Sequence, residues 1–74
     1  MSKIPSFKPI KLIRKFERMG YTKDRQKGSH IILYHHSLKR RIVIPMHIKD
    51  IPRGTLLSII KQSGLTKEEF VDKN

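Results

Sequence analysis

The sequence predicts an α+β fold in which helices cover one face of a three-stranded antiparallel sheet, in the order α-β-β-β-α. Three observations support this prediction. Apolar residues recur at helical spacing over residues 9–19, and again over residues 52–63. Between these segments, residues 21–26, 30–35 and 41–46 have the composition or the spacing of strands separated by short turns.

The first helix is expected to begin at Pro9, because the first position of a helix does not need the N–H that proline lacks. Ser6 is a candidate N-cap, although it lies earlier than the ideal position, and Gly20 is expected to end the helix. Basic residues fill the polar face, which is either solvated or in contact with phosphate. The apolar face consists of Ile10, Leu12, Ile13, Phe16 and Met19.

The three strands are predicted to form a meander. Residues 27–29, Lys-Gly-Ser, form a tight turn because glycine adopts the positive φ that such turns need. Residues 30–35 are rich in β-branched and aromatic side chains, whereas residues 21–26 are assigned as a strand only because the turn requires a partner. Residues 36–40 form the second hairpin loop, and Pro45 closes the third strand.

The second helix has two candidate starts, Asp50 as a cap before Pro52 or a later start at Gly54, and it ends at Gly64. Thr66 and Glu69 form a capping box for a short last helix. An open sheet of three strands is closed by laying both long helices on one face. This arrangement is the topology of double-stranded-RNA-binding domains. The expected core combines one face of the second and third strands with Leu12, Ile13, Phe16, Leu56, Ile59 and Ile60.

Charge is the most informative feature of the composition. Seventeen Lys and Arg against six Asp and Glu give a formal net charge of +11, which attracts polyanions, above all nucleic acids; an acidic protein partner is the alternative. The chain of 74 residues is expected to be one domain, residues 1–74. It has no cysteine, no apolar run of membrane-spanning length and no signal-peptide pattern, so we expect a cytoplasmic protein.

His30 is the candidate catalytic residue. It begins a predicted strand just after the tight turn, and Arg25 and Lys27 lie close to it in sequence. A histidine in a positive field can serve phosphodiester chemistry, because it exchanges protons near neutral pH. A purely structural histidine beside a turn is the competing interpretation.

His47 is a second candidate, for a proton transfer, an RNA contact or a structural role. It lies either beside the turn that carries His30 or at the far end of the sheet. His35 and His36 are interpreted as solvated loop residues. The histidines lack the i, i+4 spacing of a metal site, so no metal and no cofactor are expected.

The chain resembles the HicA-type toxins, small mRNA interferases of bacterial toxin–antitoxin pairs. The resemblance covers nearly the whole chain and depends on five pieces in order. They are Leu12 with Gly20-Tyr21; Arg25-Gln26-Lys27-Gly28-Ser29-His30; Val43-Ile44-Pro45-Met46-His47; Gly54-Thr55-Leu56; and Ile59-Ile60-Lys61-Gln62-Ser63-Gly64-Leu65.

The resemblance implies a double-stranded-RNA-binding-like fold, cleavage of mRNA and neutralisation by a cognate HicB-type antitoxin that covers the active face. It also implies that the histidine of the Gly-Ser-His motif, His30, is catalytic. We expect metal-independent chemistry, with RNA contacts from Arg25, Lys27, Ser29 and His47. The antitoxin is expected to bury Phe7, Tyr21 or the open sheet face.

Two rival functions remain at this point. One is a non-catalytic RNA-binding module of the same fold, although the second helix starts with a single Arg53 rather than a lysine cluster. The other is a basic protein that only binds an acidic partner.

Overall fold

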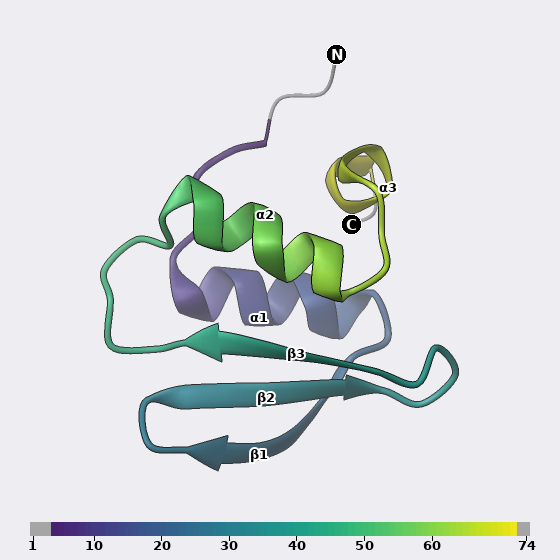
Figure 1. Ribbon diagram of the computed structural model, residues 1–74, viewed down its shortest axis with the longest axis horizontal. Coiled ribbons are helices and arrows are strands. Elements are labelled where there is room, and N and C mark those ends of the chain that lie inside the picture. Colours follow the sequence, from purple (N-terminus) through teal and green to yellow (C-terminus); the bar gives the residue numbers. More distant parts are fainter. Residues whose placement is uncertain (1–3, 73–74) are drawn as a thin grey trace.

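The computed structural model describes residues 4–72, and helices cover one side of its sheet while the other side is open (Figure 1). This confirms the predicted fold class, because the order of elements is α-β-β-β-α followed by a short helix. The elements within the described residues are α1 (Pro9–Arg18), β1 (Thr22–Lys27), β2 (His30–His35), β3 (Arg40–Pro45), α2 (Arg53–Gln62) and α3 (Lys67–Asp72).

The sheet has the order β1-β2-β3, with β2 in the centre and antiparallel to both neighbours. Gly28 and Ser29 form the two-residue turn between β1 and β2, and Gly28 has a φ of 58°. A positive φ at the first central position suits a type II′ turn, whose twist matches that of the flanking strands. The pairing of β1 with β2 shifts by one residue between Lys23 and Arg25, which marks a bulge at Asp24.

The core lies between the sheet and the helices. Ile31 and Leu33 of β2 alternate with exposed or half-exposed neighbours, so one face of the strand is buried and the other is open. Phe70 of α3 is fully buried and packs against Phe16 with 5.4 Å between ring centroids. All six helical positions expected in the core are buried, together with Ile42, Ile44, Ile4, Ile51 and Tyr21.

The helix ends confirm three of the sequence predictions. Gly20 and Gly64 follow α1 and α2 with φ values of 101° and 80°, the left-handed conformation that ends helices. The capping box of α3 is present, since Glu69 N–H donates to the Thr66 hydroxyl over 3.0 Å and Thr66 N–H donates to the Glu69 carboxylate over 2.9 Å.

Both predictions of a side-chain N-cap for the long helices are wrong. Lys8, not Ser6, is the N-cap of α1, and Pro52, not Asp50, is the N-cap of α2; neither makes a side-chain cap hydrogen bond. Instead, the extended segments that precede the two helices are hydrogen-bonded to each other. The N–H of Ile51 donates to the carbonyl of Phe7 over 2.9 Å, so tertiary contacts position these helix starts.

Tyr21 is not available to a partner, contrary to one of the three suggested antitoxin contacts. Its side chain is 2% exposed, and its hydroxyl donates a hydrogen bond of 3.1 Å to the carbonyl of Ser63. Burial raises the pKa of Tyr21 above its ordinary value of 10.0. The hydrogen bond joins the end of α1 to the end of α2, so Tyr21 is part of the framework of the fold.

Candidate functional site

His30 occupies the first position of β2, immediately after the turn, and its side chain is exposed. The register pairs it with Lys27 on β1 and with Pro45 on β3. Directly paired residues of an antiparallel sheet project from the same face. The structure therefore places the Lys27 side chain on the same face as the imidazole, as the closest cation by register.

Arg25 projects from the same open face, one row further along the sheet, where it pairs with Ile32. Its guanidinium lies 3.5 Å from the carboxylate of Asp24, which Arg41 also approaches to 3.5 Å. Arg41 in turn stacks over the Tyr34 ring at 4.6 Å. Asp24 is the only acidic residue in the three strands, so this face carries a net positive charge.

His47 lies at the same end of the sheet as His30, which resolves the two positions that the sequence left open. The centroids of the two imidazole rings are 6.4 Å apart. The N–H of Met46 donates to the carbonyl of Ser29 over 2.7 Å, so the segment that carries His47 is held against the turn that carries His30. Ser29 thus has a structural role through its backbone, and its half-buried side chain lies beside the site.

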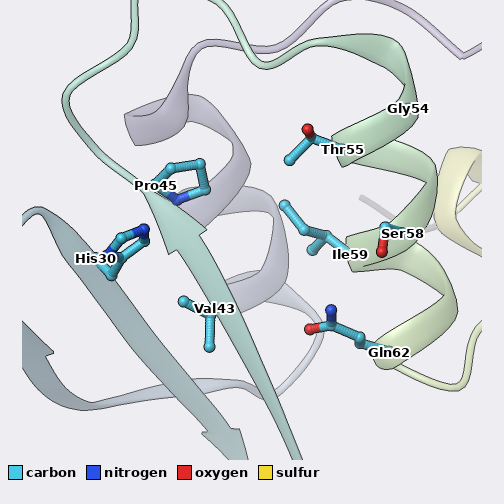
Figure 2. A pocket seen from close by; sticks show the side chains of 8 residues that line it. All are labelled: His30, Val43, Pro45, Gly54, Thr55, Ser58, Ile59 and Gln62. Atoms are coloured by element: carbon cyan, nitrogen blue, oxygen red, sulfur yellow. The ribbon is translucent and has the colours of Figure 1, made fainter.

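A groove of about 400 Å³ runs between β3 and α2 and includes His30 in its wall (Figure 2). Figure 2 shows side chains of α2 directed toward β3 from the opposite wall. The strand wall consists of His30, Val43 and Pro45, and the helix wall consists of Gly54, Thr55, Ser58, Ile59 and Gln62. Only the helical spacing of its α2 residues is visible in the sequence, because which strand that face of α2 borders depends on tertiary packing.

Of the two histidines interpreted as solvated loop residues, His36 agrees with the prediction and His35 does not. His35 is not a solvated loop residue: it ends β2, it is half-buried, and its Nδ1 accepts a hydrogen bond of 3.1 Å from the Leu38 N–H. Its ring also packs edge-on against Tyr21, with 5.1 Å between centroids. His36 is exposed in the hairpin loop, as predicted, and contacts the Tyr34 ring.

Neither a candidate metal site nor a membrane-spanning helix is found within residues 4–72. No group of three or more His, Cys, Asp and Glu side chains in this part of the chain is arranged to hold a metal ion. In the same part of the chain, none of the helices has the length and apolar character needed to cross a membrane.

The comparison with protein-family models matches most of the chain. A family model described as HicA toxin of bacterial toxin-antitoxin matches residues 11–65. The match extends from α1 to the residue after Gly64, so it includes the whole sheet, the turn that carries His30 and both walls of the groove. A search of curated proteins found no significant match.

Proposed function

Because this chain belongs to the HicA family and is thus a toxin of a toxin–antitoxin system, we propose that it is an mRNA endoribonuclease whose catalytic residue is His30. The exposed position of His30 carries the proposal. Its imidazole lies beside the Lys27 position and 6.4 Å from the ring of His47. Within residues 4–72, no hydrogen bond engages the His30 imidazole, so it is available to a substrate.

The chemistry that fits this arrangement uses the 2′-hydroxyl of the RNA as the nucleophile. The 2′-oxygen attacks the adjacent phosphorus, the bond to the 5′-oxygen breaks, and the products are a 2′,3′-cyclic phosphate and a 5′-hydroxyl. A base must take the 2′-hydroxyl proton and an acid must protonate the leaving 5′-oxygen; each such contribution accelerates a reaction by roughly 10²–10⁴-fold. His30 performs one of these transfers, and no metal ion is required.

The cations and the second histidine assist the same phosphate. Lys27, and Arg25 one row further along, attract the RNA backbone and stabilise the extra negative charge of the transition state. His47 and Ser29 contact the RNA from the segment and the turn on either side of His30. Because Asp24 competes for Arg25, Lys27 contributes more to phosphate binding than Arg25 does.

The partner that neutralises the toxin is a cognate HicB-type antitoxin that covers the open sheet face. A half-exposed Ile32 and an exposed Val43 lie between cations on this face, which suits a partner that combines apolar and acidic side chains. Toxin and antitoxin act in the cytoplasm, where mRNA is present.

The test is induced expression of the parent chain, His30→Ala and the control His36→Ala in a bacterial host, with growth and message integrity measured. The parent and His36→Ala should arrest growth and degrade messages, and His30→Ala should do neither. The purified parent should also cut RNA in the presence of a metal chelator. If parent and His30→Ala bind RNA equally and neither cuts it, the protein is a binding module of the same fold and the ribonuclease proposal is wrong.

A further inference from the structure

We propose that the groove between β3 and α2 binds one unpaired RNA base next to the phosphate that His30 attacks, and that Gln62 and Ser58 read the edge of this base. The inference rests on the proposed ribonuclease function and names what would set its sequence preference. His30 is one of the residues that line the groove, on its strand side, so an occupant of the groove lies near the imidazole (Figure 2).

The apolar part of the groove suits the flat face of a base. Val43 and Pro45 line the strand side, and the buried Ile59 lies on the helix side. Val43 is 40% exposed, so it presents apolar surface that no described part of the chain covers. Sites for small organic groups combine apolar walls of this kind with a few polar groups that fix orientation.

The polar part of the groove suits the edge of a base. Ser58 and Gln62 are one helical turn apart on α2, and both side chains are exposed. A glutamine amide both donates and accepts hydrogen bonds, and a serine hydroxyl does the same, so the pair can match the donor and acceptor pattern of one base. Within residues 4–72, no hydrogen bond occupies either side chain.

The size of the groove and the lack of acidic side chains in its walls suit a base of single-stranded RNA. A groove of about 400 Å³ falls within the range of roughly 300–1,000 Å³ typical of small-ligand sites. Bases are read in this way when they are splayed out of a single strand, since a duplex keeps them stacked and paired. No carboxylate lines the groove, so no acidic side chain in its walls repels the phosphates on either side of the base.

The test uses the non-cleaving His30→Ala chain labelled with ¹⁵N and titrated with four pentaribonucleotides, each made of a single base. The side-chain amide signals of Gln62 and the backbone amides of α2 should shift saturably, with the preferred base bound at least several-fold more tightly than the poorest. Gln62→Leu or Ser58→Ala should weaken binding of the preferred base about 3- to 10-fold. Ser37→Ala, at an exposed serine of the β2–β3 hairpin loop that does not line the groove, is the matched control and should change nothing.

A second measurement maps the cut sites of the active chain on a pool of RNA sequences. Gln62→Leu should relax the base preference next to the cut, and cleavage should slow in step with the weaker base binding without being abolished. Shifts confined to β1 and β2, or an unchanged base preference in both Gln62→Leu and Ser58→Ala, would overturn the groove proposal. The titration requires no cleavage, so a failure of the groove and a failure of the ribonuclease proposal are separate results.

Discussion

His30 and His35 are the first and last residues of the same strand, and the fold uses them in opposite ways. His35 accepts a hydrogen bond from the Leu38 N–H, packs on Tyr21 and faces Gly20 closely. His30 is exposed, projects from the open face and is engaged by no hydrogen bond within residues 4–72. One end of β2 is therefore built into the framework, and the other end presents its histidine to solvent.

The physical criterion that separates the two histidines is whether the polar atoms of the side chain already have hydrogen-bond partners in the protein. A side chain whose polar atoms are already occupied must break those contacts before it can serve a substrate, and losing them reduces stability. A side chain that is held only through its backbone can be replaced with little loss of stability. The same contrast can be tested with a glycine at each end of the sheet and with a lysine on each face of β1. Four predictions test it.

The largest effect on stability is expected from Gly20→Ala. Gly20 has a φ of 101°, and a Cβ there would lie 2.7 Å from the His35 Nε2. The substitution should lower the free energy of unfolding by about 2–4 kcal/mol. Gly28→Ala at the other end, with a φ of 58° and nothing within 4 Å of a Cβ, should cost about 1 kcal/mol. Urea unfolding compares the two variants; equal losses would show that the two ends are equally constrained.

The next largest effect is a loss of RNA affinity, which should differ between the two faces of β1. Lys27 pairs with His30 and projects from the open face, whereas Lys23 pairs with Leu33 and projects from the helix-covered face. Lys27→Gln should weaken RNA binding about 3- to 10-fold and reduce the slope of log K against log salt by about 0.7. Lys23→Gln has the same charge change and should have less effect. Fluorescence anisotropy at several salt concentrations measures both, and identical losses would indicate nonspecific attraction by net charge.

His35→Ala should destabilise the protein by about 1–2 kcal/mol, because it removes the acceptor of the Leu38 N–H and the contact with Tyr21. Thermal unfolding measures the loss. The structural role assigned to His35 would be contradicted by a variant as stable as the parent.

The smallest effect concerns the hydroxyl of Tyr21. Tyr21→Phe removes its hydrogen bond to the Ser63 carbonyl and should cost about 1 kcal/mol at pH 7. Burial raises the pKa of Tyr21, so the folded state favours the neutral phenol. The stability that the neutral Tyr21 phenol contributes is fully present below pH 10. It is lost as the pH rises through the raised pKa of the folded protein, because Tyr21 loses its proton at a lower pH in the unfolded chain than in the folded one.

The variant should therefore lack that alkaline loss. Burial lowers the pKa of Lys15, which changes stability with pH in the opposite direction, but it does so in both proteins. The difference between parent and variant, measured by urea unfolding from pH 7 to 11, isolates Tyr21. A difference that stays constant over this range would contradict the account.

Local patterns in the sequence predicted most of the fold. The β-branched and aromatic composition of β2, the glycines after α1 and α2, and the Thr66–Glu69 box each depend on nearby residues, and the predicted strand, helix ends and capping box are all present in the structure. The N-caps of α1 and α2 were mispredicted because long-range contacts, not a side-chain cap, fix their starts.

The site was only partly predictable for the same reason. The turn, His30 and Lys27 are local in sequence, but the proximity of His47 depends on the β2–β3 register. The polar wall of the groove depends on how α2 packs against β3, and the engagement of His35 depends on its contact with Tyr21. The spacing of residues in the sequence predicts neither the packing of α2 against β3 nor the contact of His35 with Tyr21.

The most direct test compares single-turnover RNA cleavage by the parent, His30→Ala and His35→Ala, with a metal chelator present and each rate expressed per folded molecule. His30→Ala should reduce the rate roughly 10²–10⁴-fold and leave the unfolding midpoint unchanged. His35→Ala should do the reverse, with a lower midpoint and a rate per folded molecule close to that of the parent. A His30→Ala protein that cleaves at the parental rate, or that loses activity only because it unfolds, would contradict the central claim that the exposed histidine carries the chemistry.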